Sequence, residues 1–366
     1  MSPRTLSRPE RVAWTRLART PRIGPITFHR LIARHRTAAA ALEALPHLHR
    51  AEALVPPPRD RIERELDALE RLGARIVAAC EPHYPSLLAA LDAPPPLIAV
   101  GGDIQLLTRP AIALVGAREG SAAGLMLAER IAADLGRAGF VVVSGLARGV
   151  DAAAHRGALA TGTVAVLAGG LDRPYPPQNT KLYEDILERG AVVSEAPLGF
   201  VARARDFPRR NHIISGLARG VVVIEAALRS GTLITARAAA EQGRDVLAVP
   251  GSPLDPRARG CNALIKSGAT LVEGAEDVIA ALEGNVALRP RSPGPLFAEP
   301  IPAPPGLAAK IATLLSPTPI HINDLARLTE APAGAVAAAL VELEIEGAAA
   351  SLPGGYAAAA SASFMG

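Results

Sequence analysis

From residue 111 onward, short apolar runs alternate with helical patterns, and this alternation restricts the possible folds more than any other feature. The β-branched runs occur at 112–115, 140–143, 163–167, 191–193, 221–224, 246–249 and 270–272. Helical patterns lie at 121–137, 152–160, 178–189, 209–217, 232–242, 259–267 and 275–283. Strands that are apolar on both faces and alternate with helices are typical of a parallel sheet covered on both sides. We therefore predict an α/β domain with a Rossmann-like doubly wound parallel sheet.

The segments on either side of this alternation have a different character. Helical patterns at 11–19, 26–34 and 38–44, with a Gly24-Pro25 turn, are similar to a helix-hairpin-helix or SAM-like unit. A helix at 61–72 and strands at 75–79 and 97–100 follow. Near the C-terminus, helical patterns at 307–315, 323–328 and 333–346 precede a glycine turn between two extended pieces. Three helices and a β-hairpin of this kind indicate a winged helix.

Proline-rich stretches divide the chain. One is Pro56-Pro57-Pro58, and a longer one covers 290–305 and has no apolar period. Such stretches are typical of linkers. The predicted domains are a helical unit at 1–58, an extended Rossmann-like domain at 59–288, a linker at 289–306 and a winged helix at 307–360.

The composition excludes several classes of protein. The longest apolar run has seven residues, whereas a membrane span needs about 20. The arginine-rich start has no apolar segment after it, so a secretory signal is not expected. Two cysteines cannot form a disulfide framework or a four-ligand zinc site. We expect a cytoplasmic protein that has no metal, no cofactor and no membrane association. The chain also lacks a P-loop motif and a Gly-x-Gly-x-x-Gly motif after its first parallel strand.

The positive charge is unevenly distributed. The chain has 36 Arg but three Lys, and residues 1–80 hold 15 Arg against eight acidic residues. A second cluster comprises Arg203, Arg205, Arg209, Arg210 and Arg219. Clusters of this kind suit a phosphate-rich partner, although a solvated arginine-rich surface gives the same pattern.

The loops at the carboxyl ends of the predicted strands hold the candidate binding residues, because ligands of parallel sheets bind there. Small residues at a helix start leave backbone amides free for an anion, and arginine adds a fork for phosphate. Tyr183 is a candidate for stacking on a base. Together these loops predict a groove for a polyanion or a phosphorylated ligand, and its candidate residues are Arg118, Ser121, Ser144, Gly145, Arg148, Asn179, Lys181, Tyr183, Arg210, Asn211, Ser230, Gly231 and Thr232.

Asp151 and His155 stand four residues apart and so share one helical face. An acid–base pair is one interpretation. The interpretation that we favour is structural, with Asp151 as the N-cap of its helix and His155 as a satisfied helix residue. No catalytic residue is therefore assigned.

A series of motifs along residues 60–285 resembles the bacterial DNA-processing protein A family, also called DprA or Smf. The motifs are VGAR at 115–118, SGLARGVDAAAHRGAL at 144–159, GGLDRPYPPQN at 169–179, SEAPLG at 194–199, FPRRNHIISGL at 207–217, SGTLITARAA at 230–239, VPGS at 249–252 and RGCNALIKSGA at 259–269. The resemblance implies a protein, not an enzyme, that binds and protects single-stranded DNA. It also implies RecA loading in natural transformation and recombination, and a homodimer formed through the Rossmann domain.

Carried onto this chain, the resemblance places Arg118, Ser144, Gly145, Lys181, Tyr183, Arg210, Asn211 and Ser230 in the DNA groove. The chain departs from the family at two positions. His212 stands where the family usually has arginine, which would weaken the groove near pH 7. Lys181 comes one residue later than the family's groove lysine, so its direction is open.

Two alternative functions remain. One is a Rossmann-fold enzyme that acts on a nucleotide-derived small molecule, similar to the phosphoribohydrolases. In that family a glutamate follows the glycine loop, and here Thr235 stands at its position. The other is a regulatory duplex-DNA binder that uses the winged helix. Its helix at 333–346 has no Lys or Arg and carries Glu342, Glu344 and Glu346, which would repel a phosphate backbone.

Overall fold

The computed structural model of the chain describes residues 4–47, 54–284, 304, 306–316, 318–352 and 355–360. Most of the predicted linker at 289–306 lies outside these residues. The chain separates into two compact units. One contains residues 8–59 together with 294–366, and the other contains residues 60–293 with a short N-terminal piece.

The larger unit is built on a sheet whose described strands follow the order β1-β2-β6-β5-β4-β3-β7-β8-β9. The neighbouring strands from β6 to β9 pair in parallel, which confirms the predicted Rossmann-like core. β2 pairs antiparallel with β6, and β1 pairs antiparallel with β2. The strands are β1 Ala74–Ala78, β2 Leu97–Gly102, β3 Ala111–Val115, β4 Val141–Ser144, β5 Thr163–Leu167, β6 Ala191–Ser194, β7 Gly220–Val223, β8 Asp245–Ala248 and β9 Thr270–Leu271.

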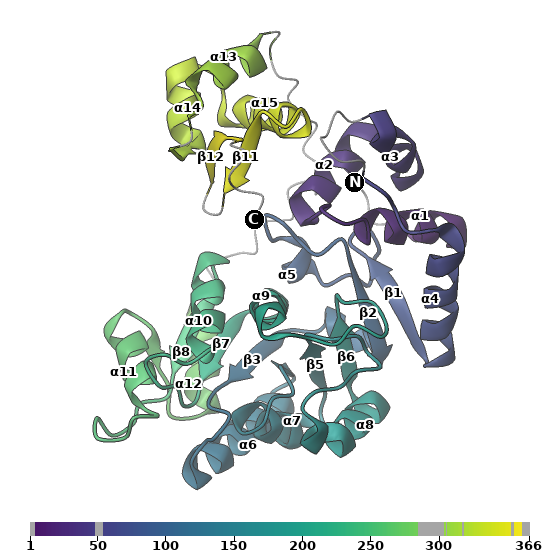
Figure 1. Cartoon of the computed structure of the whole chain (residues 1–366). Coiled ribbons are helices and arrows are strands. Elements are labelled where there is room, and N and C mark those ends of the chain that lie inside the picture. Colours follow the sequence, from purple (N-terminus) through teal and green to yellow (C-terminus); the bar gives the residue numbers. More distant parts are fainter. Residues whose placement is uncertain are drawn as a thin grey trace. The chain divides into compact units, whose positions relative to one another are not determined.

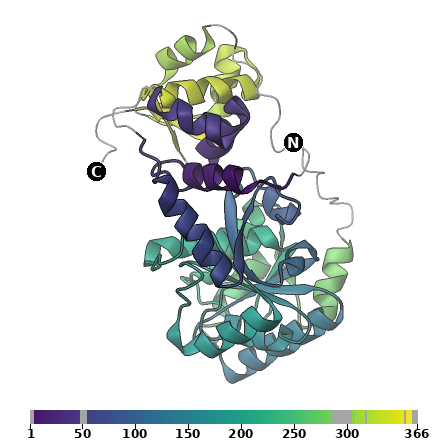
Figure 2. The same ribbon diagram turned by 90° about the vertical axis from the view of Figure 1, so that its right-hand side faces the viewer.

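Helices cover both faces of this sheet (Figures 1 and 2). α6 (Ala122–Arg137), α7 (Val150–Ala158) and α8 (Thr180–Arg189) lie on one face. α9 (Phe207–Leu217) and α10 (Thr232–Glu241) lie on the other. α11 (Arg259–Lys266) packs on β8, and α12 (Ala275–Gly284) packs on α6. The helix after β3 and the helix after β7 thus cover opposite faces, and the loops between these strands open a crevice at their carboxyl ends.

The core between the sheet and α6 is aliphatic. Ile112 and Leu114 of β3 and Leu135 of α6 are fully buried and belong to one apolar cluster. The segment before β3 adds α4 (Arg59–Arg71), which lies beside β1, and the short α5 (Ser86–Ala89), which the sequence analysis did not predict. Short 3-10 helices lie at Leu45–His47, Ile104–Thr108, Pro177–Asn179 and Ala204–Asp206.

The N-terminal helices are α1 (Arg8–Ala18), α2 (Pro25–His35) and α3 (Ala38–Ala44), as predicted within three residues. Trp14 of α1 and Phe28 of α2 meet edge to face with ring centroids 4.9 Å apart, and both are buried. Pro25 occupies the first turn of α2, where its missing N–H leaves no helical bond unmade. The Thr37 hydroxyl accepts the Ala40 N–H at 3.1 Å and so begins α3.

The C-terminal residues form a winged helix. Its helices are α13 (Leu307–Leu314), α14 (Ile322–Thr329) and α15 (Ala333–Ile345). Its sheet has the order β10-β12-β11, with β10 Ile320–His321, β11 Ala349–Leu352 and β12 Tyr356–Ala359. Ile311, Leu325 and Leu340 bring the three helices together in a separate small core.

The first prediction concerns Gly102, which ends β2 with φ of +81°. A Cβ there would lie 2.3 Å from the Gly190 carbonyl oxygen. We expect Gly102→Ala to lower the free energy of unfolding by about 2–4 kcal/mol, because backbone strain and a backbone clash add together. Urea unfolding followed by circular dichroism measures this loss.

The matched control is Gly139→Ala. Gly139 has φ of +93°, and a Cβ there would meet no atom of the described chain within 4 Å. The control therefore carries backbone strain alone, at about 1 kcal/mol. An equal loss of unfolding free energy in the two variants would show that the predicted clash at Gly102 adds nothing to the backbone strain.

Candidate nucleic-acid interface

The loops at the carboxyl ends of the parallel strands enclose a groove of about 1100 Å³. Its lining combines four arginines, two aromatic rings and several small polar residues: Arg118, Arg210, Arg229, Arg257, Tyr175, Phe207, Asn211, Ser230, Gly231 and Thr232. A smaller pocket of about 260 Å³ shares Arg118, Phe207 and Arg210 with this groove. Six of these groove residues are among the DNA-binding residues predicted from the sequence, whereas Phe207, Tyr175, Arg229 and Arg257 were not singled out there.

Phe207, the first residue of α9, stands between two cations. The guanidinium carbon of Arg118 lies 5.6 Å from its ring centroid, and that of Arg210 lies 5.5 Å away. The ring of Tyr175 meets Phe207 edge to face at 6.1 Å. An aromatic ring with two guanidiniums over it brings flat stacking surfaces and positive charge together, so the bases and the phosphates of one strand can both find partners here. The available sequence signal was an aromatic residue inside the arginine cluster, two residues before Arg209.

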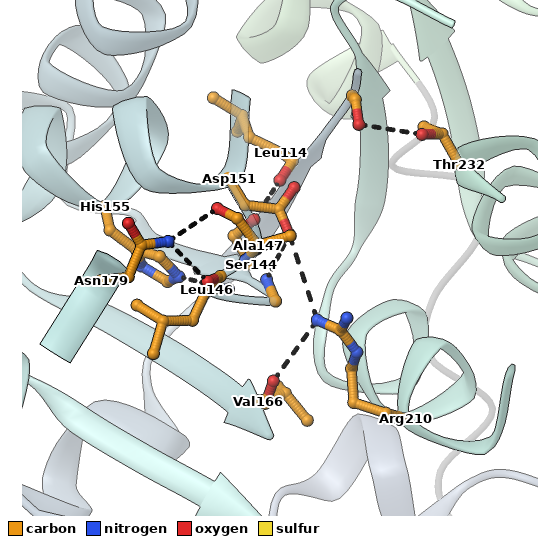
Figure 3. Close-up of polar contacts among 12 residues, drawn as sticks. Leu114, Ser144, Leu146, Ala147, Asp151, His155, Val166, Asn179, Arg210 and Thr232 are labelled. Carbon is orange, nitrogen blue, oxygen red and sulfur yellow. Dashed lines mark hydrogen bonds and ion pairs between the residues drawn. The ribbon is translucent and has the colours of Figure 1, made fainter. Parts of the chain in front are cut away.

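Arg210 is buried, with an exposed fraction of 6%. Its Nη1 lies 3.5 Å from the Val166 carbonyl oxygen and 4.0 Å from Oδ2 of Asp151 (Figure 3). Its Nε has no hydrogen-bond partner in the described structure. Burial lowers the pKa of Arg210, Asp151 raises it, and nearby Arg118 lowers it. Gly145 is required here, because a Cβ would lie 1.4 Å from Nη1.

Asp151 corrects one prediction. The residue is not the N-cap of α7, since α7 begins at Val150 and Gly149 precedes it as the cap. The Asp151 carboxylate turns back instead and accepts the N–H groups of Gly145 at 3.2 Å and Ala147 at 3.3 Å. Burial raises the pKa of Asp151, whereas Arg210 and these hydrogen bonds lower it. The carboxylate therefore shapes the loop at 144–149 and not the helix start.

His155 is fully buried and has both ring nitrogens engaged. The Thr163 hydroxyl donates to the Val142 carbonyl at 2.8 Å, so it accepts from Nδ1–H of His155 at 2.7 Å. Nε2 then accepts the Leu146 N–H at 3.3 Å. Burial, followed by the charges of Arg210 and Arg156, lowers the pKa of His155 to about 3. This neutral, satisfied imidazole supports the structural interpretation over the acid–base one.

Two predicted serines are committed to internal bonds. Ser121 caps α6 by accepting the Gly124 N–H at 2.9 Å, and its hydroxyl donates to Glu225 at 2.6 Å. The Ser121 N–H also donates to Glu225, at 2.9 Å. A carboxylate of the chain itself thus sits where the sequence suggested a ligand anion. Ser144 is fully buried and donates to the Leu114 carbonyl at 2.6 Å.

Three further predicted residues come from the segment around the start of α8. The Asn179 amide donates to the carbonyls of Leu146 and Ala147 (Figure 3). The Tyr183 hydroxyl donates to the Leu171 carbonyl, and burial raises the pKa of Tyr183 to about 12. Lys181 is exposed on α8, and its ammonium lies 2.9 Å from Asp185.

The predicted arginine cluster does not converge on one place. Arg209 forms an ion pair with Glu195, while Arg210 lines the groove. Arg219 comes just before β7 and bonds through its N–H to the Ala111 carbonyl, at the amino end of the strands. The Nδ1 of His212 lies 2.9 Å from the side-chain amide of Gln242, which directly follows α10, and His212 is not among the residues that line the groove.

Thr232 and Arg148 complete the set. The Thr232 hydroxyl donates to the Gly116 carbonyl at 2.9 Å and ties the loop after β7 to the loop after β3. Arg148 is exposed and lines the smaller pocket. Within the described residues, no group of three or more His, Cys, Asp or Glu side chains is placed to hold a metal ion. None of the described helices has the length and apolarity that a membrane crossing requires.

Family models match three parts of this chain. Residues 75–283 match the family described as DNA recombination-mediator protein A. Residues 8–68 match the DprA-like N-terminal HHH domain, and residues 295–355 match the DprA winged helix domain. The chain therefore belongs to the DNA recombination-mediator protein A family, as the motifs indicated.

Individual relatives agree. Protein Smf of Escherichia coli is 38% identical over 317 residues, which is 84% of this chain and 84% of that protein. The X-ray structure of DNA processing protein A from Streptococcus pneumoniae superposes with a TM-score of 0.59 at 36% identity, covering 70% of this chain and 86% of the other. The Helicobacter pylori protein, whose structure describes a single-stranded DNA binding mode, gives a TM-score of 0.53 at 27% identity, covering 58% and 96%.

The second prediction uses the titration of His155. Its pKa is about 3 in the folded protein, against 6.5 when unperturbed. Below pH 6.5, His155 therefore binds a proton in the unfolded chain but stays neutral in the folded protein. This group's contribution to stability is complete above pH 6.5 and falls by up to about 1.4 kcal/mol per pH unit as the pH drops toward 3.

Urea unfolding of the wild type and of His155→Gln, measured from pH 7.5 to pH 4.5, tests this expectation. The glutamine does not titrate, so the stability advantage of the wild type should shrink steadily with acidification. Parallel pH curves for the two proteins would show that His155 is not held neutral.

Proposed function

We propose that this chain binds single-stranded DNA in the groove, protects it and helps to load RecA on it during natural transformation and recombination. The observation that carries the proposal is Phe207 between the guanidiniums of Arg118 and Arg210. Single strands expose both bases and phosphates, and this arrangement offers each of them a partner. The family membership and the DNA-binding relative from Helicobacter pylori support the same reading.

We assign the contacts with the DNA phosphates to Arg118 and Arg210 in the groove and to Arg148 in the smaller pocket, and the stacking surface to Phe207 and Tyr175. Further contacts are proposed for four small polar residues that line the groove: Asn211, Ser230, Gly231 and Thr232. Ser121, Ser144, Gly145 and Asn179 support the loops that carry these groups. Lys181 and Tyr183 on α8 are proposed contacts for a strand that continues past the groove.

We propose binding without catalysis, in the cytosol. The alternative enzyme similar to the phosphoribohydrolases needs a general base beside its ligand. Thr235 occupies the position of that family's glutamate and is buried, and His155 is neutral and bonded at both nitrogens. We also propose a homodimer through the Rossmann-like domain. Leu271 on the edge strand β9 is 47% exposed and offers an apolar surface for such a contact.

The third prediction tests the groove with Arg118→Ala. Arg118 is exposed, so its removal leaves the fold intact. Single-strand affinity should fall about tenfold, because a charge-assisted phosphate contact is lost. The slope of log K against log salt should decrease in magnitude by about 0.7. Fluorescence anisotropy with a labelled oligo-dT at several salt concentrations measures both quantities.

Arg130→Ala is the matched control. Arg130 is an exposed arginine of α6, with an exposed side-chain fraction of 81%, and lies outside the groove lining. It should leave affinity and slope at the wild-type values. Unchanged binding in Arg118→Ala would remove this groove from the model. Arg210→Ala is a poorer test, because it also leaves the buried Asp151 carboxylate without its counter-charge.

The fourth prediction concerns the winged helix. Residues 307–360 hold two basic and five acidic residues, and the helix at 333–346 has no cation. Like charge opposes contact with a phosphate backbone, so truncation after Leu288 should leave single-strand affinity within about twofold of the full chain. A large loss of affinity in a truncated protein with native circular dichroism would assign DNA contacts to this domain.

A further inference from the structure

We propose that Asn179 is a positioning residue that fixes the spacing between two walls of the DNA groove. It acts through the backbone of the loop at 144–149 and not by touching DNA. The inference rests on the proposed function and assigns to Asn179 a role different from the direct contact suggested by sequence.

The smaller pocket beside Arg118 lies between two chain segments. One wall is formed by Gly145, Ala147 and Arg148, and the other by residues 175–178. Asn179 comes directly after the second wall. Its Nδ2 donates to the Leu146 carbonyl at 2.9 Å and to the Ala147 carbonyl at 3.1 Å, both in the first wall (Figure 3). One side chain therefore links two loops that are far apart in sequence.

The loop at 144–149 needs external support because of its backbone. Leu146 has φ of +55° and is fully buried, a conformation that is unfavourable for a branched side chain. The N–H groups of the loop are held from α7 by Asp151 and His155. Asn179, which lies outside the unit formed by β4, this loop and α7, donates hydrogen bonds to two carbonyls of the loop. It is thus the side chain that couples the strained loop to the opposite wall.

The link made by Asn179 fixes the positions of Arg148 and Tyr175, two residues of the proposed DNA site. Arg148 directly follows Ala147 in the held loop, and Tyr175 lies four residues before Asn179 in the other wall. Without the two bonds, Arg148 and Tyr175 lose their fixed separation, although no charge is removed. Affinity should therefore fall while the number of counterions released on binding stays the same.

Two uncharged variants isolate this effect. Asn179→Ala removes both donor hydrogens. Asn179→Ser also fails to reach the two carbonyls, but serine is a favoured residue at a helix N-cap, the position that Asn179 holds in α8. A defect shared by both variants therefore comes from the lost link and not from a weaker α8. Asn262→Ala is the control, because Asn262 bridges both backbone groups of Gly251 at 2.8 and 3.2 Å, outside the two walls.

The experiment measures oligo-dT affinity of the full chain by anisotropy at several salt concentrations, with thermal unfolding recorded for each variant. We expect both Asn179 variants to bind about tenfold more weakly with the wild-type salt slope, and Asn262→Ala to bind as the wild type does.

Wild-type affinity in both Asn179 variants would overturn the inference. A slope reduced by about 0.7 would also overturn it, since a charged contact with a phosphate, and not only the spacing of the walls, would then have been lost. A wild-type chain that does not bind oligo-dT would instead reject the proposed function on which the inference rests.

Discussion

The charge of Arg210, buried at the carboxyl end of the sheet, is the constraint on which the site depends. A buried guanidinium is stable only opposite a counter-charge and hydrogen-bond acceptors. Asp151 supplies the charge, and Val166 supplies a carbonyl. The same carboxylate accepts the amides of Gly145 and Ala147, so the charge balance and the shape of the loop at 144–149 are set by one interaction.

The two loops that carry the proposed DNA-contacting arginines are interlocked. The Val150 N–H donates to the Ala117 carbonyl at 3.1 Å. Gly149, with φ of +76°, passes so close that a Cβ would lie 2.2 Å from the same oxygen. Arg118 follows Ala117 directly. The loop between β4 and α7 therefore holds the backbone next to Arg118 in place. This fixes the position from which the Arg118 side chain reaches Phe207.

Glu225 places a carboxylate of the chain itself at the start of α6. Its carboxylate accepts both the N–H and the hydroxyl of Ser121 at the start of α6. Gly124 leaves room for it, because a Cβ at that position would lie 2.6 Å from the carboxyl carbon. A helix N-terminus in this place commonly binds a ligand phosphate. With an internal anion there, anion binding in this groove depends on arginine side chains instead.

The sequence by itself determined most of the elements, since period and turn residues are local properties: the predicted strand at 163–167 and helix at 38–44 coincide with β5 and α3. It also determined the family and the strand ends at which the candidate groove lies. The tertiary structure alone decided that β1 and β2 extend the sheet antiparallel, that Ser144 faces the core, and that Phe207 stands between two arginines. Each of these features depends on contacts between residues that are far apart in the chain, and a local sequence pattern does not predict such contacts. For the same reason, the sequence did not predict that Asp151 faces Arg210 and not the start of its own helix.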